Sequence, residues 1–169
     1  MLHVTPGREK SWRGAGMGHL VNHSGSESMK YSEHPDYIKY GAALADGNVV
    51  VARAALETCL KDRRLTDDPI KHSDLLRRMA AVVFECGDQV GAIDYFRKAE
   101  LTDPQSLLVK LQFAEFLADK LGDKRSAIQK CDLVMSIAQA SPFPETDADF
   151  SSADYIEKAE RIKRSVLGQ

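Results

Sequence analysis

The sequence lacks the features that mark membrane, zinc-binding or disulfide-bonded proteins. No apolar run reaches the roughly 18 residues of a transmembrane helix, and residues 1–28 contain no apolar core of a signal peptide. The three cysteines, Cys59, Cys86 and Cys131, are far apart and form no Cys-x-x-Cys pair, which argues against a zinc site or a disulfide framework. We therefore expect reduced thiols and a cytoplasmic protein.

Neither sign of charge dominates the chain. It has 23 Lys and Arg against 25 Asp and Glu, a formal net charge of -2 at pH 7 and a pI near 6.2. Domains that bind nucleic acid are usually clearly basic, so we expect no nucleic-acid partner, and no membrane partner either. Basic clusters such as residues 61–64 have acidic neighbours, which favours a solvated face.

Motifs of catalysis and metal binding are also missing. There is no Gly-rich phosphate loop, Gly-x-Ser-x-Gly elbow or His-Glu-x-x-His pair. Only His19 and His23 of the five histidines have i, i+4 spacing, and their Gly-rich surroundings disfavour a helix, so we expect no metal and no cofactor. Cys59 and Cys131 fall on apolar stripes, whereas Cys86 is the most exposable thiol. We therefore expect that the protein is not an enzyme. A thiol-regulated switch that uses Cys86 is one alternative.

The two ends of the sequence differ from its middle. Five of the 11 glycines lie in the first 28 residues, without a helical period, which predicts a flexible leader over residues 1–34. A translation start at Met29 is an open hypothesis. Residues 141–150 contain two prolines and are predicted to be a linker. Residues 151–169 then form an amphipathic helix, with Ser151 or Ser152 as its cap.

Residues 35–140 are predicted to form helices separated by short turns. The first helix begins at Pro35 and stops at Gly47. Its expected packing face consists of Tyr37, Tyr40, Gly41 and Leu44.

Capping residues mark the later helices. Asn48, Asp68 and Asp88 are each predicted to cap a helix, and Gly87 to end one. Asp103 is predicted to cap a further helix, with Pro104 in its first turn.

One pattern of turn and small, aromatic and small residues is repeated. After Gly87 and Asp88, Ala92, Phe96 and Ala99 recur at i, i+4 and i+7. A second copy lies 35 residues later (122 − 87) and a poorer one 40 residues earlier (87 − 47). The later copy comprises Gly122, Asp123, Ala127, Cys131 and Val134, and the earlier one Gly47, Asn48, Ala52, Leu56 and Cys59.

This pattern resembles the tetratricopeptide repeat, a helical hairpin of about 34 residues with an Ala-x3-Phe signature and a closing proline. The best copy matches at Leu76, Met79, Ala80, Val83, Ala92, Phe96, Ala99 and Pro104. In the next copy Cys131 replaces the aromatic residue and no proline follows at the expected place.

The resemblance implies an all-α, right-handed α-solenoid of about three hairpins, at about residues 35–67, 68–103 and 104–140. A C-terminal helix at 151–169 would cap the last repeat, or serve as a detachable interaction helix.

The resemblance also implies a protein–protein interaction module, such as an adaptor, scaffold or small chaperone. Its concave groove would bind a hydrophobic or amphipathic segment of a partner protein. The expected groove residues are Ile38, Ala42, Arg77, Ala81, Phe84, Leu108, Leu111 and Glu115. Family members that grip a peptide's terminal carboxylate need an Asn where this chain has Ala81, which disfavours that mode.

Two alternatives to a partner groove stay open. Phe84, Leu108 and Leu111 could be buried between repeats or covered by the C-terminal helix. The apolar groove could instead pair copies of the chain, giving a homo-oligomer without a foreign ligand.

Overall fold

The chain is all-α over the residues that the computed structural model describes, 30–140 and 151–168, where no strand occurs. The predicted all-α class is confirmed for these ranges. The leader up to residue 29 and the linker at 141–150 lie outside them. The elements are η1 (Tyr31–Glu33), α1 (Pro35–Ala45), α2 (Val49–Cys59), α3 (Arg63–Thr66), α4 (Pro69–Glu85), α5 (Gln89–Thr102), α6 (Leu107–Asp119), α7 (Lys124–Ala140) and α8 (Ser152–Leu167).

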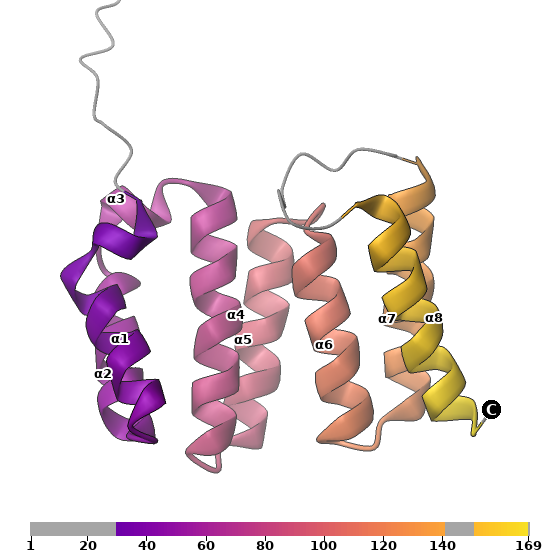
Figure 1. The fold of residues 1–169 in the computed structure, drawn as a ribbon, viewed down its shortest axis with the longest axis horizontal. Coiled ribbons are helices and arrows are strands. Elements are labelled where there is room, and N and C mark those ends of the chain that lie inside the picture. Colours follow the sequence, from indigo (N-terminus) through magenta and orange to yellow (C-terminus); the bar gives the residue numbers. More distant parts are fainter. Residues whose placement is uncertain (1–29, 141–150, 169) are drawn as a thin grey trace, which may run out of the picture.

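The long helices pack as adjacent pairs. α1 packs on α2, α4 on α5 and α6 on α7, while α8 packs on α7 and also contacts α6. Figure 1 shows the first helix of each pair, together with α8, in a front row, and α2, α5 and α7 behind. One face of the molecule is therefore built from α1, α4, α6 and α8.

The turns inside the three pairs share one geometry. Gly47, Gly87 and Gly122 have φ of 69°, 87° and 65°, a left-handed conformation that glycine adopts without a steric cost. The residue after each glycine accepts a hydrogen bond from the backbone N–H three positions on, at 3.1, 2.8 and 3.1 Å. The three capping residues are Asn48, Asp88 and Asp123.

The start of α6 differs from the prediction. The cap is Ser106, whose hydroxyl accepts from the Val109 N–H at 3.3 Å, and the helix begins at Leu107. Asp103 instead ends α5, with φ −132° and ψ 88°. The proline that follows disfavours helical backbone in the residue before it, so Asp103 is held extended.

Two further local differences concern the first 70 residues. The polar run after α2 contains the short helix α3, whose Leu65 is fully buried. In α1 the buried residues are Tyr40 and Ala43, whereas Gly41 and Leu44, predicted to pack, are exposed.

The core has two main clusters, joined around α6. In the first, the ring of Phe96 on α5 stacks on Phe113 of α6, with centroids 4.8 Å apart and planes 3° apart. The second lies between α6, α7 and α8. Tyr155, Ala159, Ile162 and Val166 of α8 are buried in it.

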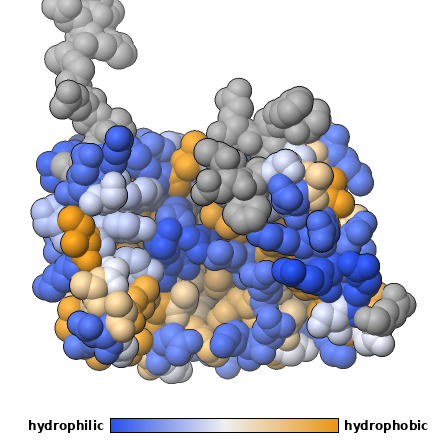
Figure 2. Space-filling model, viewed as in Figure 1, coloured by the Kyte–Doolittle hydropathy of each residue, from blue (hydrophilic) through white to orange (hydrophobic). Residues whose placement is uncertain are grey.

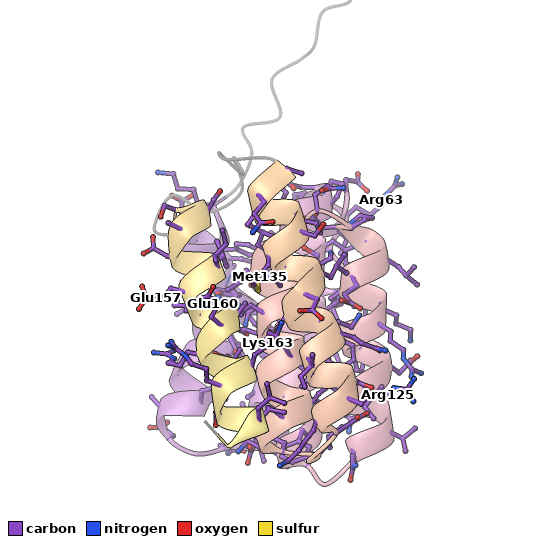
Figure 3. All side chains as sticks on the ribbon, turned by 90° about the vertical axis from the view of Figure 1, so that its right-hand side faces the viewer. Arg63, Arg125, Met135, Glu157, Glu160 and Lys163 are labelled. Atoms are coloured by element: carbon purple, nitrogen blue, oxygen red, sulfur yellow. The ribbon has the colours of Figure 1, made fainter. Side chains whose placement is uncertain are left out.

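α8 is held by caps and a charged contact as well as by its apolar stripe. Ser151 and Asp154 form a reciprocal capping box at its start. Lys163 donates to Asp132 of α7 at 2.5 Å. Figure 3 shows Met135, Glu160 and Lys163 along the line where α7 and α8 meet.

Candidate functional site

The face made by the front-row helices contains a hollow between α4 and α6. We call it the α4–α6 hollow; its volume is about 270 Å³. Its apolar lining comes from Ala81, Phe96 and Phe116. The polar lining residues are Arg77, Gln112, Glu115, Asp119 and Lys120.

A second hollow, the α6–α8 hollow, lies beside the first and has a volume of about 260 Å³. Glu115 and Asp119 line both hollows. The α6–α8 hollow is lined by Glu115, Ala118, Asp119, Arg161, Ile162, Ser165 and Val166.

The cation at the α4 side of the α4–α6 hollow is already paired. Arg77 donates to the carboxylate of Asp74 and to the side-chain oxygen of Gln112. Burial alone would raise the pKa of Asp74, but the neighbouring charges of Arg77 and Arg78 and their hydrogen bonds lower it on balance. This network joins α4 to α6 and leaves Arg77 only 9% exposed.

The carboxylates on the α6 side are not paired in this way. Among the described residues, the side chains of Glu115 and Asp119 form no hydrogen bond or ion pair. Burial, followed by the negative charge of Asp119, raises the pKa of Glu115, and the positive charges of Lys158 and Arg161 oppose this. The face thus presents a half-buried carboxyl group without a hydrogen-bonded partner.

Several apolar side chains on α1 and α4 are exposed to solvent. Ile38 is 56% exposed, and Ala42, Ala45 and Ala81 are also exposed. Phe84 is half-buried, with its ring edge-on to Phe116 at 5.1 Å between centroids. Figure 2 shows hydrophobic colouring across the lower centre of this face, over α4 and α6, bordered by hydrophilic residues.

The structure brings together only part of the predicted groove. Arg77, Ala81 and Glu115 line the α4–α6 hollow. Leu111 is 3% exposed and belongs to the core cluster under α8, so it lies inside the molecule and not on a groove wall. Leu108 is half-buried and lines a separate hollow near Tyr31.

Sequence reasoning missed the residues of α6 that line the hollow, Gln112, Phe116 and Asp119. The sequence contains a pattern that could have identified two of them, Gln112 and Asp119. The segment Leu107–Asp119 is largely apolar, and its polar residues at positions 112, 115 and 119 follow one another at spacings of three and four. Such a stripe on an apolar helix marks the side that is open to water.

A second polar cluster lies at the start of α1. His34 is 4% exposed, and its Nε2 lies 3.1 Å from Oδ2 of Asp62. Its Nδ1 accepts from the Asp36 N–H at 3.2 Å and lies 3.7 Å from Sγ of Cys59. Because Nδ1 is an acceptor here, the ring hydrogen belongs on Nε2, directed at Asp62.

His34 lies between Cys59 and Asp62, which is the arrangement of a thiol catalytic triad. The sulfur of Cys59, however, is poorly suited to nucleophilic attack. Cys59 is fully buried, and burial raises the pKa of its thiol to about 11. Burial likewise raises the pKa of Cys131 to about 11. Cys86 is the exposed thiol.

The described residues contain neither a metal-binding cluster nor a membrane-spanning helix. Within 30–140 and 151–168, no group of three or more His, Cys, Asp or Glu side chains is arranged to hold a metal ion. The pair His19 and His23 lies outside these ranges. No helix in the same ranges is long and apolar enough to cross a membrane.

Comparison of the chain with models of known protein families finds no matching family. Comparison with curated proteins finds no similar sequence.

Proposed function

We propose that the chain is a right-handed stack of three tetratricopeptide-like hairpins, 35–67, 68–103 and 104–140, capped by the helix at 151–169, and that it is a non-enzymatic protein-interaction module. The stack is supported by equivalent positions that are equally buried. Ala52, Ala92 and Ala127 are each 0% exposed, and each lies in the second helix of its pair, four residues after the cap. Small residues at these positions let paired helices approach closely.

The observation that carries the interaction function is the open front face. Its α1 and α4 helices leave Ile38, Ala42 and Ala81 exposed, and Ala81 lines the α4–α6 hollow with its apolar floor. Exposed apolar surface bordered by polar residues is typical of protein-binding sites. A hydrophobic or amphipathic partner segment would place its apolar side chains here.

A displayed library of random peptides, panned on the full chain, tests this function. We expect enrichment of peptides with apolar anchors at helical or extended spacing. Ala81→Arg places a long charged side chain in the α4–α6 hollow and should abolish most of the enrichment. Val90→Arg is the matched control, because Val90 is 78% exposed at the start of α5, in the back row.

Circular dichroism melting should show that both variants stay folded. Equal binding by the two variants, or no enriched peptide with the unmodified chain, would contradict the proposed function.

Self-association is a second candidate, supported by α1 alone. Ile38, Ala42 and Ala45 recur at i, i+4 and i+7 and are all exposed, which forms an uncovered apolar stripe. If two copies pair through this stripe, sedimentation will show a dimer that Ile38→Asp disperses. A chain that stays monomeric at high concentration excludes this candidate.

A further inference from the structure

We propose that the α4–α6 hollow receives a basic side chain, lysine or arginine, from the partner segment. The methylene stem would pack on the apolar floor, and the cationic head would face Glu115 and Asp119. This inference rests on the proposed function, since it names the chemistry of the segment that the front face binds.

The size of the hollow fits one long side chain. Its volume is about 270 Å³, whereas pockets for small molecules and cofactors usually measure about 300–1,000 Å³ and enclose most of the ligand. The α4–α6 hollow is open to the face and lies beside a second hollow of similar size. A peptide lying across the face can therefore insert a side chain here while its backbone stays outside.

The floor suits the stem of such a side chain. Ala81, Phe96 and Phe116 supply apolar surface, and the two rings lie 5.1 Å apart between centroids. Lysine and arginine bury their methylene groups on surfaces of this kind and keep the charged head at the polar edge. Aromatic faces additionally attract cations.

The charges that face the hollow favour a cation over an anion. Arg77 is engaged by Asp74 and Gln112. Lys120, a second cation in the lining, has its ammonium nitrogen 5.8 Å from the centroid of the Phe84 ring.

Glu115 and Asp119 are one helical turn apart and repel each other. Arg161 and Lys158 act on Glu115 from the α8 side and only partly offset this repulsion and the burial of the group. A cationic head between the two carboxylates would relieve both costs, whereas a carboxylate placed there would add to them.

The test uses arrays of nonapeptides that differ only at the central position, which is lysine, arginine, norleucine or glutamate. The full chain should bind the lysine and arginine series about three- to tenfold better than the norleucine series, the range of a partly exposed charged hydrogen bond. Glu115→Gln should reduce this preference, and Glu115→Arg should shift it to glutamate. Glu157→Gln is the matched control, because Glu157 is an exposed carboxylate on α8 that lines neither hollow.

The outcomes separate this inference from the function it rests on. Peptides that bind without a basic preference, or with one that Glu115→Gln leaves unchanged, overturn the inference and leave the interaction function standing. Failure of every peptide to bind overturns both. A dimer in sedimentation that Glu115→Gln disperses makes a second copy of the chain the occupant, and overturns the basic-peptide proposal.

Discussion

The imidazole of His34 ties the beginning of α1 to the beginning of α3, because its Nε2 lies 3.1 Å from Oδ2 of Asp62. The other ring nitrogen caps α1 by accepting the Asp36 N–H. Asp62 in turn caps α3 through the Arg64 N–H at 2.9 Å. One buried ring thus connects two helix starts that lie 28 residues apart in sequence.

Replacing His34 with alanine should lower the free energy of unfolding by about 2 kcal/mol, the sum of a lost cap and a lost hydrogen bond to a charged group. His34→Asn keeps a capping oxygen but is too short to reach Asp62, so it should lose about half as much. Urea denaturation of the three proteins measures the difference. Equal stability of all three would show that the ring contributes nothing.

The Asp74 network gives a pH-dependent prediction. Asp74→Asn should cost about 3 kcal/mol at pH 7, the low end for breaking a buried ion pair, because the Asp74 side chain is 19% exposed. The pKa of Asp74 is lowered in the fold, so its contribution is present above the unfolded value of 3.8 and is lost as the pH falls through the folded value. The difference in melting temperature between the two proteins should therefore shrink below about pH 4. A constant difference from pH 7 to pH 3 would contradict the assignment.

Leu111 and Ile38 distinguish core from open surface. Leu111→Ala removes a buried aliphatic side chain and should cost about 2–5 kcal/mol. Ile38→Ala is the matched change at a site that is 56% exposed, and should cost under about 0.5 kcal/mol. Chemical denaturation measures the free energy of unfolding of both variants. If Leu111→Ala leaves it nearly unchanged, Leu111 lies on an accessible surface instead.

The three thiols should react at very different rates. Cys86 is exposed, whereas Cys59 and Cys131 are 0% exposed with pKa values raised to about 11 by burial. Iodoacetamide at pH 8 should therefore modify one thiol in the native chain and all three after denaturation. Intact mass spectrometry counts the adducts. Rapid native modification of all three would mean that the buried thiols become exposed on the timescale of the reaction.

Helix ends were predictable from sequence wherever a single local signal decides them. Gly87 has the left-handed φ and Asp88 the capping bond that their order predicts, since both depend only on neighbouring backbone. Asp103 carries two conflicting signals, because an Asp-Pro pair can begin a helix or end one. The extended backbone before Pro104 prevails, and Ser106 provides the cap.

Local sequence patterns could not decide which distant segments of the chain are in contact. Spacing alone left two alternatives for Leu111, a groove wall or a position covered by the C-terminal helix. The structure places it in the core cluster with α8, more than 40 residues further on. His34 likewise gives no sign in the sequence of its partner Asp62. The solvent-facing side of α6 was partly predictable from the sequence, because Gln112, Glu115 and Asp119 are spaced as one polar stripe.

Glu115 belongs to the walls of both hollows, and this shared wall makes them thermodynamically dependent. A charge that enters one hollow changes the protonation and the field that the other presents. By linkage, each occupant must alter the affinity for the other by the same factor. Two side chains of one segment that fill both hollows would therefore bind non-additively, and the shared carboxyl groups of Glu115 and Asp119 would be the origin of the coupling.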